Sequence, residues 1–194
     1  MIGIGYPTPL TTYNVGGEQP GFTPDINTPD NTNEPYLTWT TYMSGLSDSE
    51  VPQVISTSYG DDEQTVSESY AKVVCDQFAQ LGARGVTLFF SSGDFGVGAD
   101  DTCYSSADNS TYMFIPSFPA SCPYVTAIGA TRSYPEVAAS RLLRSGLYWA
   151  SGAGFSNYFS QPGYQASAVD GYVSSLDGLY DGMYNKSGKP ALCP

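Results

Sequence analysis

Apolar and polar positions alternate most clearly between residues 51 and 91, where two short apolar runs flank an amphipathic stretch. The first run, residues 51–59, is rich in β-branched residues and predicts a strand. The second run, residues 86–91, predicts another strand. Between them, apolar residues recur at the three- and four-residue spacing of one helical face. The predicted buried stripe of this helix is Ala71, Val74, Cys75, Phe78 and Leu81.

The ends of this predicted helix carry recognisable signals. Thr65 precedes Glu68 by three residues, which is a capping-box pattern, and Gly82 supplies a stop. A strand–helix–strand unit of this length predicts a right-handed parallel crossover. The segments that follow the two strands, Ser58-Tyr59-Gly60 and Ser92-Gly93-Asp94, would then lie at the same edge of the sheet. We therefore expect them to form one wall of a cleft.

The remaining elements are predicted from weaker patterns. We expect helices at 34–46 and 165–176, a strand at 124–130, a glycine-rich turn at 151–157 and a long irregular loop at 7–33. Residues 1–7 lack the basic and apolar regions of a signal peptide, and we interpret them as an internal strand. The residues after 177 carry no clear pattern.

Composition narrows the classes of function. The 194 residues carry a formal net charge of −12 with only seven Lys and Arg, so we expect no binding to nucleic acid. No run approaches the length of a membrane-spanning helix, so we expect no membrane partner. The acidity suits low pH, where carboxyl protonation reduces self-repulsion.

The chain contains no histidine, so it cannot by itself form a Ser-His-Asp or Cys-His site. The four cysteines form no CxxC pair, and we expect no metal site. The preferred disulfide is Cys103–Cys122, with other pairings open. Asn109 and Asn185 begin potential glycosylation sequons. Together these features favour an oxidising, extracellular setting.

Asp94 is the principal candidate for chemistry. It follows a buried strand within Ser91-Ser92-Gly93-Asp94, and open α/β sheets bind ligands beyond the carboxyl ends of their strands. The alternative is a tight turn in which Asp94 only accepts hydrogen bonds from nearby amides. The acidic groups Asp61-Asp62-Glu63 and Asp100-Asp101 lack the spacing of a calcium loop, and we expect them to be solvated turns.

Six collinear motifs carry a resemblance to a known family. They are residues 33–37, 53–63, 81–86, 91–94, 118–126 and 154–159, with sequences NEPYL, QVISTSYGDDE, LGARGV, SSGD, FPASCPYVT and GFSNYF. Over about residues 1–186 the chain resembles the sedolisin, or serine-carboxyl, peptidases, and in particular their secreted fungal tripeptidyl-peptidase members.

This resemblance implies a subtilisin-like α/β fold with a parallel sheet and flanking helices, here incomplete at both ends. It also implies cleavage of peptide or protein substrates at acidic pH by a Ser nucleophile, a Glu base and an Asp partner. A second Asp stands at the oxyanion hole, and Asp94 matches it. Ser58-Tyr59-Gly60 matches the segment that pairs with substrate, and we add Ser92 and Gly93 as substrate-binding candidates.

An ionised carboxylate only accepts hydrogen bonds, so Asp94 would have to be neutral to donate its O–H to a developing oxyanion. The family's base, its Asp partner, its nucleophile and its calcium ligands find no matching motif here. We therefore expect residues 1–194 to form one partial peptidase domain with a divergent tail at 187–194, and to hold no cofactor. Ser91, Ser92 and Ser156 are local serines, but the sequence shows no base for any of them.

Two alternatives remain open. The chain is either part of an active peptidase, of undetermined exo or endo type, or a catalytically inactive truncated product that at most binds peptides. A third reading is an unrelated acidic secreted binding module, which would be rich in β-structure rather than helix.

Overall fold

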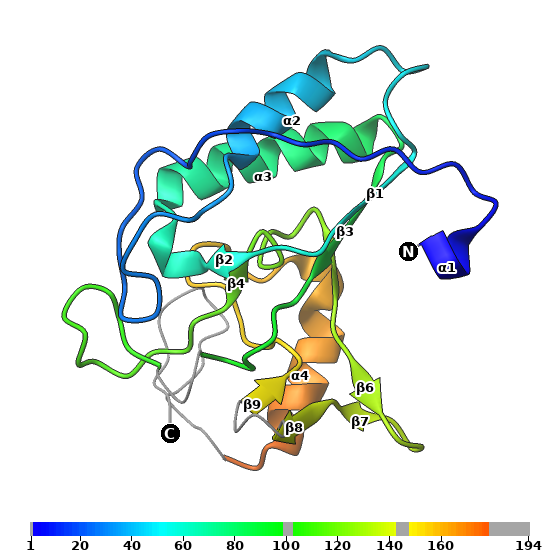
Figure 1. The fold of residues 1–194 in the computed structure, drawn as a ribbon. Helices are drawn as coiled ribbons and strands as arrows, with labels where there is room; N and C mark the ends of the chain where they lie inside the picture. Colours follow the sequence, from blue (N-terminus) through cyan, green and yellow to red (C-terminus); the bar gives the residue numbers. More distant parts are fainter. Residues whose placement is uncertain (1, 99–102, 143–147, 179–194) are drawn as a thin grey trace.

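A three-stranded parallel sheet lies at the centre of the computed structural model, which describes residues 2–98, 103–142 and 148–178 (Figure 1). Its strands are β1 (Val54–Thr57), β3 (Thr87–Ser91) and β5 (Thr126–Ile128), in the order β1-β3-β5. Both pairs are parallel, with Thr57 opposite Phe90 and Phe90 opposite Ala127. The expected α/β class and the parallel strand–helix–strand unit are confirmed.

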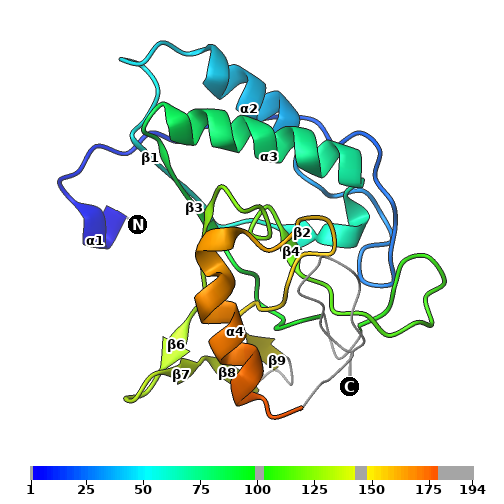
Figure 2. The ribbon, with the colours of Figure 1, turned by 180° about the vertical axis from the view of Figure 1, so that it is seen from behind.

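Two helices, α2 (Tyr36–Gly45) and α3 (Glu68–Ala83), lie side by side along the sheet (Figures 1 and 2). The apolar face of α3 packs onto Leu88 and Phe90 of β3, and the rings of Phe78 and Phe90 lie 5.2 Å apart between centroids. Every residue of the predicted α3 stripe is buried. Both helices were predicted, and this shared core fixes β3 beneath them.

The predicted ends of α3 are wrong by a residue or two. The N-cap is Ser67, whose hydroxyl accepts a hydrogen bond from the Tyr70 amide, and not Thr65. Thr65 instead ends a short 3₁₀ helix, η1 (Glu63–Thr65), and donates its hydroxyl to the carbonyl of Asp62 at 2.7 Å. That bond occupies the Thr65 side chain, so the helix begins later. The helix also runs past Gly82 to Ala83.

The first residues form a short helix, α1 (Ile2–Gly5), and not the predicted strand. Ile4 is 98% exposed, so this segment packs on no sheet that would hold it extended. The following residues run as an irregular segment past α2, as the pattern of residues 7–33 predicted (Figure 1).

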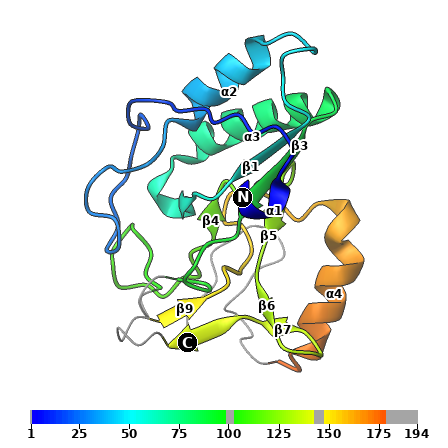
Figure 3. The same cartoon turned by 45° about the vertical axis from the view of Figure 1, so that its right-hand side comes forward.

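The other strands form short two-stranded antiparallel ladders. β2 (Asp61–Asp62) pairs with β4 (Ser117–Phe118), β6 (Thr131–Arg132) with β7 (Val137–Ala138), and β8 (Ser140–Leu142) with β9 (Tyr148–Ala150). The chain then passes through η2 (Gly163–Gln165) into α4 (Ala166–Ser175), a predicted helix. α4 lies away from α2 and α3, with β6 and β7 near its far end (Figure 3).

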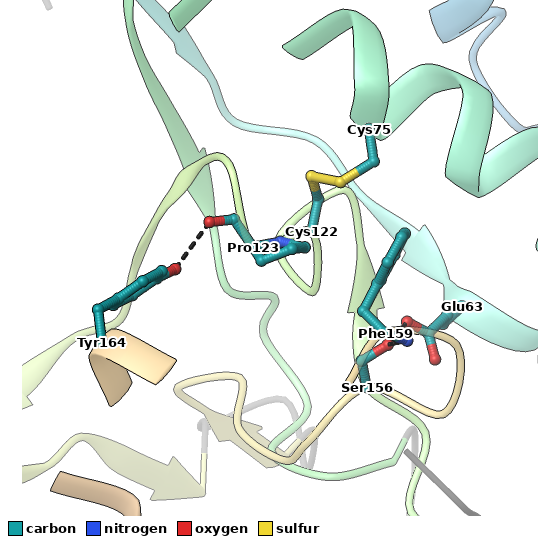
Figure 4. Close-up of a disulfide and its surroundings, with 7 residues drawn as sticks. All are labelled: Glu63, Cys75, Cys122, Pro123, Ser156, Phe159 and Tyr164. Atoms are coloured by element: carbon teal, nitrogen blue, oxygen red, sulfur yellow. Dashed lines mark hydrogen bonds between the residues drawn. A yellow bond between two sulfur atoms is a disulfide. The ribbon is translucent and has the colours of Figure 1, made fainter. Parts of the chain in front are cut away.

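The disulfide prediction is wrong. Cys122 pairs with Cys75, and the Cα atoms of the two residues are 5.8 Å apart. Cys75 lies on the buried face of α3, which packs over the loop that follows β4, so the bond ties the helix to that loop (Figure 4). Cys103 is also disulfide-bonded. Within the described ranges, no helix is both long and apolar enough to cross a bilayer.

Candidate active site

Asp94 follows the central strand β3 in a turn at its carboxyl end. Gly93 has φ +98°, a left-handed conformation that side-chain-bearing residues rarely adopt, so the turn favours glycine there. The Asp94 side chain is exposed. A carboxyl group thus projects from the sheet edge at which α/β proteins bind ligands.

The end of β9 and the residues that follow it are hydrogen-bonded to this turn. The amide of Gly152 donates to the carbonyl of Gly93 at 2.8 Å, and the amide of Ala150 donates to the carbonyl of Asp94 at 2.9 Å. A Cβ atom on Gly152 would lie 1.7 Å from the carbonyl oxygen of Ser92. Only glycine permits this approach, which explains part of the glycine-rich turn seen in the sequence.

The side chain of Asp94 has one hydrogen-bond partner among the described residues. The indole Nε1–H of Trp149, in β9, donates to Oδ1 of Asp94 at 2.9 Å. The local-turn reading, in which Asp94 only accepts from nearby amides, therefore does not describe this contact. Trp149 was not among the residues that sequence reasoning selected, because nothing local indicates a partner 55 residues away.

The turn after β1 lies at the same edge, as the parallel register requires. Gly60 and Gly93 both face Ser117 in β4: a Cβ atom on Gly60 would lie 2.4 Å from its Oγ, and one on Gly93 would lie 3.6 Å from its Cβ. Ser117 is therefore a shared neighbour of the two predicted turns, and no sequence pattern had selected it.

Three of the predicted substrate-binding residues are divided between two pockets. Ser92 and Ser117 line a pocket of about 730 Å³ together with the loops at 120–127 and 152–165. Ser58 and Tyr59 line a second pocket of about 660 Å³, against residues 8–15 and the α2 residue Trp39. Gly60, Gly93 and Asp94 line neither of these two pockets.

The hydroxyl group of Tyr59 contacts two other residues. That oxygen lies 2.8 Å from the carbonyl of Thr32 and 2.8 Å from Oδ1 of Asp61. The backbone carbonyl of Tyr59 accepts from the Tyr36 hydroxyl at 3.1 Å. Burial, and then the neighbouring charge of Asp61, raise the pKa of Tyr59. The turn after β1 is thus anchored to the loop before α2.

The expectation that Asp61-Asp62-Glu63 is a solvated turn is wrong. Glu63 is fully buried, and the other two side chains are partly buried. Burial raises the pKa of Asp61 from 3.8 to about 6. Burial, and then the charge of Asp25, raise the pKa of Asp62 from 3.8 to about 7. The other acidic pair, residues 100–101, lies outside the described residues.

Glu63 is bonded to the loop that contains Ser156 (Figure 4). The Ser156 hydroxyl donates to Oε1 of Glu63 at 2.5 Å, and the Asn157 amide donates to Oε2 at 2.6 Å. Burial raises the pKa of Glu63, and these hydrogen bonds partly offset that rise. No sequence pattern predicts these contacts, because Ser156 and Asn157 lie 93 and 94 residues from Glu63 in the chain.

A serine bonded to a carboxyl group raises the question of whether Ser156 is a nucleophile. Glu63 lies beside Ser156, which the sequence did not indicate, but the other hydrogen bonds of Ser156 give it a structural role. The Ser156 oxygen also accepts hydrogen bonds from the amides of Tyr158 and Phe159, at 3.0 and 2.9 Å. With its proton donated to Glu63, both lone pairs are occupied and none is left to attack a carbonyl.

Only one of the two predicted glycosylation sites can be placed. Asn109 is exposed, whereas Asn185 lies outside the described residues. Among the side chains whose positions are described, no three His, Cys, Asp or Glu residues are grouped so as to hold a metal ion.

Comparisons with known proteins support the resemblance. Tripeptidyl-peptidase sed4 of Aspergillus fumigatus is 44% identical over 180 residues, which cover 90% of this chain and 28% of that protein. Tripeptidyl-peptidase SED2 of Arthroderma otae is 41% identical over 193 residues, or 97% of this chain and 30% of that protein. No protein-family model matches the chain.

A solved structure gives the same result. Pseudomonas sedolisin, a serine-carboxyl proteinase solved in complex with two molecules of pseudo-iodotyrostatin, is 26% identical with a TM-score of 0.51. The match covers 80% of this chain and 40% of that one. The chain is therefore homologous to part of the sedolisin-type serine-carboxyl peptidases. Its curated relatives within that class are fungal tripeptidyl-peptidases, and the chain spans less than a third of their length.

Proposed function

We propose that this chain is a segment of an acid-acting, extracellular sedolisin-type peptidase and that Asp94 is its oxyanion-hole residue. The observation that carries this proposal is the place of Asp94: an exposed carboxyl group on a glycine turn at the end of the central parallel strand. Identity of 44% to a tripeptidyl-peptidase supports the substrate class, namely peptides or proteins.

The chemistry follows from the charge that develops during amide cleavage. Attack on the carbonyl carbon places negative charge on the carbonyl oxygen, and that charge needs a hydrogen-bond donor. Asp94 donates only in its neutral form, so the reaction that it assists is favoured at acidic pH. The acidic composition and the Cys75–Cys122 disulfide support an acidic, oxidising environment outside the cell.

The nucleophilic Ser and its Glu and Asp partners match no motif of these 194 residues. We therefore propose that hydrolysis depends on sequence beyond them. The alternative is an inactive product that at most binds peptides, and the occupied oxygen of Ser156 favours inactivity of the segment by itself.

The first test uses a chimera in which this chain replaces the homologous segment of the Aspergillus fumigatus sed4 tripeptidyl-peptidase. We expect Asp94→Ala to lower kcat by about 10²- to 10³-fold with little change in KM. Asp30→Ala, which removes another exposed carboxyl group, is the matched control. Unchanged kcat in Asp94→Ala would remove Asp94 from the oxyanion role.

The second test uses the 194-residue chain alone with a tripeptidyl reporter substrate between pH 3 and pH 7. We expect no hydrolysis above the uncatalysed rate. Clear turnover that survives removal of trace proteases would mean that the nucleophile lies within this chain.

A further inference from the structure

The contact between Trp149 and Asp94 carries an inference that deepens the proposed function and rests on it. An indole N–H is a hydrogen-bond donor and offers no acceptor. Oδ1 of Asp94, at 2.9 Å from Nε1 of Trp149, must therefore act as an acceptor. In a neutral carboxyl group, this contact favours the hydrogen on the other oxygen, Oδ2, because a carbonyl oxygen is a stronger acceptor than a hydroxyl oxygen.

We propose that Trp149 is a positioning residue for the oxyanion donor. By holding Oδ1 as an acceptor, it assigns the hydroxyl of neutral Asp94 to Oδ2. Within the described part of the chain, no side chain or amide donates to Oδ2, which leaves this oxygen available to face a substrate carbonyl. Without the indole, the proton would occupy either oxygen and the side chain would turn more freely about its χ2 angle.

The backbone makes this role separable from a purely structural one. The turn that carries Asp94 is already held by main-chain hydrogen bonds from Ala150 and Gly152, at 2.9 and 2.8 Å. These bonds do not involve the indole ring. Trp149 is also paired within the β8–β9 ladder, opposite Arg141, so its backbone stays in place when its side chain is changed. Trp149→Phe should therefore remove the donor and leave the turn where it is.

The kinetic test is a double-mutant cycle in the sed4 chimera. We expect Trp149→Phe to lower kcat by about 5- to 10-fold, the effect of one hydrogen bond, with KM nearly unchanged. In the Asp94→Ala background, the same change should have no further effect, because Trp149 acts through that side chain. If Trp149→Phe slows both backgrounds by the same factor, its role is structural and the proposal is overturned.

Failure of the positioning role can be told apart from failure of the proposed function. If Asp94→Ala alone leaves kcat unchanged, the oxyanion assignment fails. If Asp94→Ala is slow but Trp149→Phe is as fast as the parent, only the positioning role fails.

A second measurement needs no activity. The chain has two tryptophans, so a spectrum of the 194-residue chain labelled with ¹⁵N should show two indole N–H signals. We expect Asp94→Ala to shift the Trp149 signal and to leave that of Trp39, which packs against Phe78, in place. Two unmoved signals would show that the contact does not exist in solution and would overturn the proposal.

Discussion

Replacing Asp62 by Asn should stabilise the chain at neutral pH and leave its stability at acidic pH nearly unchanged. The Asp62 side chain is partly buried beside the buried Asp25, and Asn27 donates to its Oδ2 at 3.3 Å. Its pKa is raised to about 7, first by burial and then by the charge of Asp25. The folded protein therefore keeps a proton on Asp62 that the unfolded chain loses near pH 4.

The sign of the effect follows from proton binding. Between about pH 4 and pH 7 the folded state binds more protons than the unfolded state, so the free energy of unfolding falls as pH rises. A difference of about three pH units, from 3.8 to about 7, corresponds to at most about 4 kcal/mol. Asp61, whose pKa is raised to about 6, and the buried Glu63 contribute in the same direction.

The assay is urea unfolding followed by circular dichroism at pH 4, 5, 6 and 7. We expect the parent chain to lose several kcal/mol across this range. Asp62→Asn should resemble the parent at pH 4, since the amide has the shape of a neutral carboxyl group, and should be about 2 to 4 kcal/mol more stable at pH 7.

Asp30→Asn is the matched control, because it removes one negative charge from an exposed position. If general repulsion from the net charge of −12 caused the pH dependence, both variants would flatten it equally and 1 M salt would abolish it. Equal pH slopes for Asp62→Asn and the parent, or stability that rises from pH 4 to pH 7, would refute the reasoning.

Three further outcomes are expected. Ser156→Ala should lower the free energy of unfolding by about 1.5 to 3 kcal/mol in urea titrations, because it removes a hydrogen bond to a buried carboxyl group. If the same change abolished activity in the sed4 chimera and left stability unchanged, Ser156 would instead be a nucleophile. Replacing Cys75 and Cys122 together by Ala should lower the free energy of unfolding by about 4 kcal/mol in the same assay, since the disulfide closes a loop of 47 residues. A non-reducing peptide map that joins Cys122 to another cysteine would contradict the pairing. Gly152→Ala should lower the melting temperature far more than Gly163→Ala, whose added methyl would meet open space.

Sequence patterns predicted the elements whose residues repeat at regular spacing. The buried stripe of α3 follows from the 3.6-residue period and β3 from a short apolar run, and both were placed within a residue or two. The parallel pairing of β1 with β3 followed from the helix between them. The motif resemblance selected the class of peptidase, and the role that it implies for Asp94 stays a prediction.

Contacts between distant segments were beyond sequence reasoning. The acidic run Asp61-Asp62-Glu63 was predicted to be a solvated turn because no neighbouring part of the sequence indicates that it is buried. The residues that hydrogen-bond to the Glu63 side chain, Ser156 and Asn157, lie far away in the chain. Cys75 was predicted correctly as a buried helix residue, but its partner is set by how α3 packs on the loop after β4. Trp149 was missed for the same reason.

The separation between Glu63 and its partners bears on how the protein is made. During synthesis, α3 and β3 leave the ribosome while the segment containing Ser156 is still being added, more than 90 residues after Glu63. Until then the Glu63 carboxyl group lacks its hydrogen bonds from Ser156 and Asn157. A nascent chain arrested before Asn157 should therefore stay protease-sensitive around Glu63. The chain length at which resistance appears would show when the loop that contains Ser156 binds Glu63.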